Sequence, residues 1–307
     1  PQGNVAAFHR FYPIGPEKEH YEFINPFAVD PSDENILYQP AGRFLYRQND
    51  LAGIPLNSGF DSIAQGWSRY PDSVPAGGSI TAITVSQKAP AHRIYFGTSN
   101  NRIYRVDNAH TGNPTFTLLP RPISNNAAFV SCFTVDPDNG DRVLLLYSNY
   151  GIYSLFLSEN AGQTWRRVAG NLEENLNGSG NGPSLRWISM LPQPGGRRKY
   201  FCGTSVGLYS TDTLVVHTAT QKTNWVQESP DGIGSTVVSY VDTRPADGLV
   251  VAATHGNGMF TAQFDPAVSV SAPFETSVVR TWPNPARTTF FIEIPAVSAS
   301  RPASVTL

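Results

Sequence analysis

The stretch from Leu144 to Trp165, LLLYSNYGIYSLFLSENAGQTW, contains three strand-like runs separated by two tight turns. The first turn is Asn149-Tyr150-Gly151, and the second is Glu159-Asn160-Ala161-Gly162. Asn and Gly adopt the left-handed backbone geometry that short hairpin turns require. The stretch therefore predicts antiparallel strands joined by hairpins, with Trp165 at the start of a further strand as a packing anchor.

The same succession of strand-like runs and turns recurs along the chain, and each copy ends at an aromatic residue. These closing residues are Tyr46, Tyr104, Tyr153, Tyr209 and Phe260, at intervals of roughly 50 residues. A fourth strand is expected after each of the first four copies, anchored by Trp67, Phe116, Trp165 and Trp225. Four short antiparallel strands at this interval are typical of a β-propeller blade. The predicted fold class is all-β, a β-propeller of four-stranded antiparallel blades, with about five blades in the chain.

The fifth copy lacks an aromatic-anchored fourth strand after Phe260. Because a bare sheet edge invites aggregation, another segment should pair with it. We expect either that residues before Tyr21 supply the missing strand, or that further blades precede Pro1 and the chain is a piece of a longer protein.

Composition supports an all-β fold and argues against several functions. Gly (26) and Pro (25) are abundant, and charged residues make up only 15% of the 307 residues. A net charge of −2 does not indicate the excess of positive charge that nucleic-acid binding requires. No apolar run is long enough to cross a bilayer. Cys132 and Cys202 fall in predicted strands and are expected to be buried, although a disulfide between them stays open. No metal or other cofactor is predicted.

The turn from Ser158 to Trp165 resembles the Asp-box, Ser-X-Asp-X-Gly-X-Thr-Trp, of BNR-repeat propellers. The matching positions are Ser158, Asn160, Gly162, Thr164 and Trp165, with Asn160 in place of the usual Asp. The resemblance covers about residues 21–264 and implies a propeller of the superfamily that includes sialidases, xyloglucanases and sortilin-like proteins. It implies a structural role for these five residues, which fix a hairpin on the face opposite the ligand.

The end of the chain carries a second resemblance. Pro283-Asn284-Pro285-Ala286, followed by the strand-like 288–294, is similar to the start of the C-terminal sorting domain of type IX secretion substrates in Bacteroidetes. An ordinary small β-domain after a Pro-rich linker is the alternative. The predicted organisation is a propeller over 1–264, a linker over 265–277 and the start of a sorting β-sandwich over 278–307. The resemblance implies contact with the type IX secretion machinery and a location outside the cell or on its outer surface.

Ligand-binding candidates come from the loops that a propeller gathers on one face. These are the turns between second and third strands and the loops leading into each first strand. Polar, amide-rich and aromatic side chains in these loops suit a glycan or a surface protein. The candidates are Arg43, Asn100, Asn101, Asn149, Tyr150, Glu173, Glu174, Arg186, His255 and Asn257.

No catalytic residue is predicted. Glycosidases need two carboxylates at a defined separation, and the adjacent pair Glu173 and Glu174 should point apart. The preferred interpretation is a secreted or cell-surface binding module with no catalysis of its own within this chain. Two alternatives remain: a glycoside hydrolase-like enzyme with its carboxylates in preceding blades, and a structural surface-layer or adhesin component.

Overall fold

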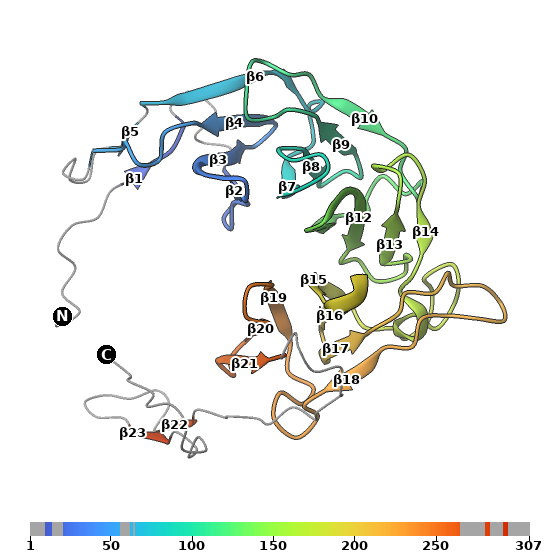
Figure 1. Cartoon of the computed structure of the whole chain (residues 1–307). Coiled ribbons are helices and arrows are strands. Elements are labelled where there is room, and N and C mark those ends of the chain that lie inside the picture. The colour runs from blue at the N-terminus through green and yellow to red at the C-terminus, as the bar shows by residue number, and fades with distance from the viewer. Residues whose placement is uncertain are drawn as a thin grey trace.

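The computed structural model describes residues 10–13, 21–55, 62–63, 65–264, 280–282 and 291–293. It contains four four-stranded antiparallel sheets and one three-stranded antiparallel sheet, arranged as successive blades of a β-propeller (Figure 1). The predicted fold class is therefore confirmed.

The blades follow the sequence, and in each the first strand lies innermost. Blade 1 consists of β2 (Ala28–Asp30), β3 (Asp33–Ala41), β4 (Phe44–Gln48) and β6 (Trp67–Ser73). Blade 2 consists of β7 (Ile80–Val85), β8 (Ile94–Thr98), β9 (Ile103–Val106) and β10 (Thr117–Leu119). Blade 3 consists of β11 (Val130–Asp136), β12 (Asn139–Tyr147), β13 (Leu155–Ser158) and β14 (Arg166–Arg167). Blade 4 consists of β15 (Leu185–Pro192), β16 (Arg198–Thr204), β17 (Gly207–Thr211) and β18 (Val226–Glu228). Blade 5 consists of β19 (Val238–Arg244), β20 (Leu249–Thr254) and β21 (Met259–Gln263).

Among the described residues, four further short strands and two single-turn 3₁₀ helices lie outside these sheets. Strands β1 (Arg10–Phe11) and β5 (Ser62–Ile63) pair in parallel, and β22 (Arg280–Trp282) pairs antiparallel with β23 (Phe291–Glu293). The 3₁₀ helices are η2 (Gly170–Leu172) and η3 (Pro194–Gly196).

Blade 5 has three strands in the described part of the chain, as its sequence predicts. The expectation that residues before Tyr21 supply its fourth strand is not met by β1, because β1 pairs with β5. Residues 1–9 and 14–20 lie outside the described residues, as do most of 265–307, so the predicted domain boundaries stay predictions.

The anchor residues tie the outer strands of successive blades together. The indole Nε1 of Trp165 donates to the carbonyl of Pro120 at 2.8 Å, and that of Trp225 donates to the carbonyl of Val168 at 3.4 Å. Trp225 is only 2% exposed. Each indole therefore reaches from its own blade back to the end of the preceding one.

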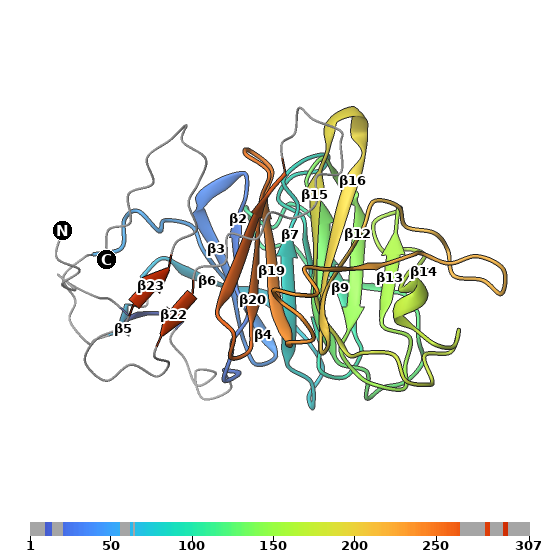
Figure 2. The same ribbon diagram turned by 90° about the horizontal axis from the view of Figure 1, so that it is seen from below.

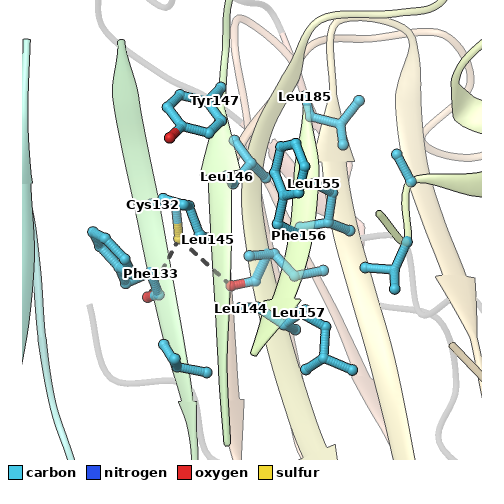
Figure 3. Packing of buried hydrophobic residues seen from close by; sticks show 14 of the residues in the cluster. Cys132, Phe133, Leu144, Leu145, Leu146, Tyr147, Leu155, Phe156, Leu157 and Leu185 are labelled. Atoms are coloured by element: carbon cyan, nitrogen blue, oxygen red, sulfur yellow. Dashed lines mark hydrogen bonds between the residues drawn. The ribbon is translucent and has the colours of Figure 1, made fainter. Parts of the chain in front are cut away.

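The core lies between the blades. One cluster joins blades 2, 3 and 4, a second joins blades 1 and 2, and a third joins blades 4 and 5. Figure 3 shows the leucines of β12 and β13 packed in the first cluster beside Cys132 and Phe133. Fully burying one such side chain contributes about 1.5–3 kcal/mol.

Glycine allows the blades to approach closely at two equivalent positions. A Cβ on Gly97 would lie 2.3 Å from Cγ1 of Val130, and one on Gly203 would lie 2.7 Å from the carbonyl oxygen of Val238. In both cases the neighbour is the start of the next blade's innermost strand. Any larger residue would push adjacent blades apart.

Both cysteines are free thiols buried in the first cluster. Burial raises the pKa of the Cys132 thiol to about 12. The Sγ of Cys132 points toward the carbonyl of Ile188 in blade 4 at 3.7 Å. These thiols pack as small apolar groups.

Buried aspartates join adjacent blades at two equivalent places. Asp30, in the β2–β3 turn, lies 2.9 Å from Nδ1 of His92 in blade 2. Asp136, in the β11–β12 turn, accepts hydrogen bonds from the guanidinium of Arg198 in blade 4 at 2.9 and 3.0 Å. The end of one blade's innermost strand is thereby fixed near the start of the next blade's second strand, because His92 lies two residues before β8 and Arg198 is the first residue of β16.

Candidate functional site

Loops gather at both ends of the upright strands, and Figure 2 shows these two faces from the side of the arc. We call one of them the loop face. It consists of the turns at 42–43, 99–102, 148–154, 205–206 and 255–258, together with the lead-in loops at 74–79, 120–129, 168–184 and 229–237.

Hydrogen bonds join each lead-in loop to the turn of its own blade. The amide of Ser99 donates to the carbonyl of Ser79 at 3.0 Å, and that of Ser205 donates to the carbonyl of Ser184 at 2.9 Å. In blade 5, the amide of His255 donates to the carbonyl of Val237 at 2.8 Å. The predicted gathering of these loops on one face is therefore present in the structure.

The lead-in loops also bind the preceding blade. The Ser184 hydroxyl donates to the carbonyl of Ser148 at 2.6 Å, and the amide of Val74 donates to the carbonyl of Arg43 at 2.9 Å. The loop face is thus held by a continuous series of bonds within and between blades. Side chains that project from it start from a fixed backbone.

Exposed apolar side chains collect on the loop face of blades 3 and 4. Tyr150 is 67% exposed, and Phe129, Leu176 and Val206 are between 37% and 40% exposed. All four come from turns or lead-in loops of these two blades, and we call them the blade 3–4 patch. Sequence reasoning selected Tyr150 and missed the other three, although apolar residues in loops otherwise rich in Asn, Ser and Gly are a visible signal.

The Gly-rich loop at 175–182, which carries Leu176, packs against the turn that carries Tyr150. Gly178 has φ +82°, and a Cβ there would lie 2.0 Å from the carbonyl carbon of Ile152. Only glycine permits this approach to the turn that carries Tyr150. Further along the loop, the carboxylate of Glu174 accepts a hydrogen bond from the amide of Asn181 at 2.8 Å.

Glu173 lies beneath the loop face and is 4% exposed. Its Oε1 accepts hydrogen bonds from the amide of Ser154 at 2.8 Å and from the Ser154 hydroxyl at 2.6 Å. Burial raises the pKa of this carboxyl group. Glu173 therefore joins blade 3 to the lead-in loop of blade 4, while Glu174 bonds to a different partner, as the prediction that the two point apart requires.

The candidate asparagines mostly satisfy backbone groups. Asn101 is fully buried, and its amide group donates to the carbonyls of Ile123 and Asn125 at 2.9 and 2.8 Å. Asn149 accepts from the amide of Phe129 at 2.6 Å, and Asn100 accepts from the Thr98 hydroxyl at 2.7 Å.

The remaining candidates differ in how far they reach solvent. Arg43 is half-buried, with its guanidinium 5.2 Å from the ring centre of Phe44. Arg186, His255 and Asn257 are exposed. The structure does not place His255 and Asn257 with Tyr150, because they belong to blade 5 and Tyr150 belongs to blade 3.

Arg186 occupies a β-bulge that recurs in four innermost strands. The pairing register shifts between Leu185 and Trp187, which leaves Arg186 as the extra residue. The equivalent extra residues in the other blades are Thr81, Ser131 and Ser239. Bulges redirect a side chain out of the regular alternation, and Arg186 is exposed.

The turn from Ser158 to Trp165 lies on the opposite face. The Ser158 hydroxyl accepts a hydrogen bond from the amide of Gly162 at 2.9 Å, and Oδ1 of Asn160 accepts from the amide of Thr164 at 2.9 Å. Nδ2 of Asn160 donates to the Thr164 hydroxyl at 2.9 Å. These side chains are used within the hairpin itself.

Within the described residues, no group of three or more His, Cys, Asp or Glu side chains is arranged to hold a metal ion. The same residues include no helix long and apolar enough to cross a membrane.

No protein-family model matches the chain, and no match is found among curated proteins. Solved structures do resemble it. Raptor from Chaetomium thermophilum superposes with a TM-score of 0.52 at 11% identity, over 83% of this chain and 21% of that chain. The Cps50 (Swd1) β-propeller domain from Myceliophteria thermophila gives a TM-score of 0.49 at 11% identity, over 82% of this chain and 70% of that chain. At such identity, the likeness shows the β-propeller fold alone.

Proposed function

We propose that this β-propeller is a binding module whose ligand is a protein segment seated on the blade 3–4 patch. The observation that carries the proposal is the exposure of Phe129, Tyr150, Leu176 and Val206 on a hydrogen-bonded scaffold. Exposed apolar groups that converge on one face mark interaction sites. A preformed backbone also reduces the entropy lost on binding.

The chemistry of the patch favours a protein over a glycan. Leu176 and Val206 are aliphatic and offer no hydrogen bonds to sugar hydroxyls, whereas they can pack against apolar side chains. Tyr150 adds a large amphipathic surface of the kind enriched in protein–protein hot spots. Arg186, with its exposed guanidinium, would favour a segment that carries a carboxylate near its apolar residues.

The test is binding of a displayed peptide library and of a glycan array to the purified chain and to two variants. Val206→Asp places a charge in the patch and should reduce capture of selected peptides at least tenfold. Val226→Asp is the matched control, because Val226 is 58% exposed on the outermost strand β18 and away from the loop face. Equal loss in both variants, or binding only to glycans, would contradict the proposal.

A hydrolase and a spacer make different predictions in the same experiment. A reducing-sugar assay with polysaccharides should show no turnover by the complete protein. Turnover would favour the glycoside hydrolase-like alternative. Absence of any selected ligand, together with incorporation into a regular surface assembly, would favour the surface-layer or adhesin component.

We also propose that the protein is exported by a type IX route and acts outside the cell or on its outer surface. The support is the resemblance of Pro283-Asn284-Pro285-Ala286 to the start of a sorting domain. These residues lie outside the described ones, between strands β22 and β23. In a host with type IX secretion, the protein should reach the medium or outer surface, and a variant that lacks 278–307 should stay inside. Equal export of both would contradict this route.

A further inference from the structure

The two ends of the arc expose surfaces that the other blades bury. The comparison rests on a motif shared by the innermost strands of blades 1 and 3, Phe-X-Val-Asp-Pro, which spans Phe27–Pro31 in one and Phe133–Pro137 in the other. The two aspartates of this motif make the equivalent inter-blade contacts already described. The positions before them can therefore be compared one by one.

In blade 3 the apolar side chains of this motif are covered by blade 2. Thr134 faces blade 4, because its hydroxyl bonds to the carbonyl of Ile188. Since side chains alternate along a strand, Phe133 and Val135 face blade 2. They are 4% and 8% exposed.

In blade 1 the same positions are open. Phe27 is 64% exposed and Val29 is 45% exposed. Ile24, three residues before Phe27, is 86% exposed, whereas Val130, three residues before Phe133, is fully buried. Blade 1 thus exposes the apolar side that, in blade 3, is covered by the preceding blade. No described blade covers this side of blade 1.

Blade 5 exposes the other side of a blade, the side that a following blade would cover. Leu208 and Met259 each precede the closing aromatic of their blade. Leu208 is 1% exposed and lies in the cluster between blades 4 and 5, whereas Met259 is 75% exposed. Thr243 faces blade 4 through a 3.0 Å bond from its hydroxyl to the carbonyl of Met190, so its exposed neighbour Asp242 faces away.

We propose that these two surfaces bind further blades of the same repeat, carried by the same polypeptide, which complete the ring. Blade 1 offers the side that receives a preceding blade, and blade 5 offers the side that receives a following one, so the occupant must present both sides of a blade. Among the described strands none pairs with the outer edge of β21, and such an edge calls for a fourth strand. A second copy of this arc would give a ring of about ten blades, more than the four to eight that are typical.

The two methionines of the chain provide a direct readout. Met190 is 2% exposed and serves as the buried control for Met259. Peroxide oxidation followed by mass spectrometry should modify Met259 much faster than Met190 in residues 1–307. In the complete polypeptide encoded by the gene, Met259 should react at least tenfold more slowly than in residues 1–307.

A charged substitution tests the other end of the arc. Phe27→Asp should leave the unfolding midpoint of residues 1–307 nearly unchanged, and should lower that of the complete polypeptide by about 5 °C or more. Phe133→Asp is the control and should destabilise both.

Three outcomes would overturn the proposal. The first is equal Met259 oxidation in both polypeptides. The second is an equally small effect of Phe27→Asp in both. The third is protection of Met259 in residues 1–307 that increases with protein concentration, which would identify a second copy as the occupant.

Discussion

The joint between blades 1 and 2 and the joint between blades 3 and 4 use the same positions with different chemistry. In the first, the carboxylate of Asp30 lies against His92 and accepts the Tyr38 hydroxyl at 2.9 Å. In the second, Asp136 faces the fork of the Arg198 guanidinium. Both aspartates are at most 2% exposed.

The two joints differ in whether the basic partner of the aspartate is always charged. Arginine is always charged and matches a carboxylate with two parallel donors, whereas the charge of an imidazole depends on pH. Burial by itself would raise the pKa of Asp136, but hydrogen bonds from Arg198 and from the amide of Asp138 outweigh it and lower the pKa. One joint is therefore an ion pair, and the other is a hydrogen-bonded network that contains histidine.

Removing Asp136 should cause the largest loss of unfolding free energy among the variants of these two joints. Asp136→Ala leaves Arg198, whose side chain is 11% exposed, without its buried partner, and should cost about 3–5 kcal/mol of unfolding free energy. Denaturant unfolding at pH 7 measures this. Because the folded pKa of Asp136 is lowered, its contribution is present above the ordinary value of 3.8 and is lost as the pH falls below it. A loss under about 1 kcal/mol at pH 7 would show that the ion pair does not hold the blades together.

Removing Asp30 should have a smaller effect. Asp30→Ala deprives the fully buried Tyr38 hydroxyl of its acceptor and should cost about 1–3 kcal/mol. The same denaturant experiment measures it. A loss equal to that of Asp136→Ala would mean that the two joints are energetically alike despite their different cations.

The change in unfolding free energy that pH causes at the first joint should be smaller than the loss caused by either aspartate substitution. His110 stacks on His92 with ring centres 3.9 Å apart, and burial followed by the like charge of His92 lowers its pKa. The folded state therefore holds the neutral imidazole, so this contribution is present above the ordinary pKa of 6.5 and declines as the pH falls below it. Asp30, Asp33 and Arg47 also act on this ring. His110→Gln should flatten the stability curve below that pH, and an unchanged slope would contradict this account.

The exposed pair Arg244 and Asp247 should show the smallest effect and provides the reference. Their side chains are 63% and 38% exposed, and Oδ1 of Asp247 lies 2.8 Å from Nε of Arg244. Water screens such a pair, so Asp247→Asn should leave denaturant stability unchanged within error. A measurable loss there would indicate that charge alone, rather than burial at a joint, determines the energies of the other variants.

The repeat made the architecture predictable. The closing aromatics recur at a regular interval because each of them supplies packing that every blade needs. The anchors Trp165 and Trp225 pack between blades, where the structure places both indoles. The ring closure was harder to predict. Nothing in the short strand at Arg10–Phe11 indicates whether it pairs with β21 or with β5.

The candidate site was less predictable because side chains in turns do not follow a strand's alternation. Asn101 and Glu173 look like ligand contacts in the sequence, yet both turn inward to satisfy buried groups. Phe129 and Val206 turn outward, although their residue types suggest a core. The direction of such side chains depends on contacts between blades that are distant in sequence.

The bulge repeated in four innermost strands has an evolutionary consequence. At Thr81, Ser131, Arg186 and Ser239, one residue in each strand lies outside the ladder, so its identity is released from the demands of pairing. Mutations at the exposed Arg186 and Ser239 can alter the charge and size of these side chains without disturbing the ladder, whereas the Thr81 hydroxyl donates to the carbonyl of Val130 in the next blade at 2.6 Å. A lineage could thereby acquire new specificities by changing the two codons of Arg186 and Ser239 while the framework persists.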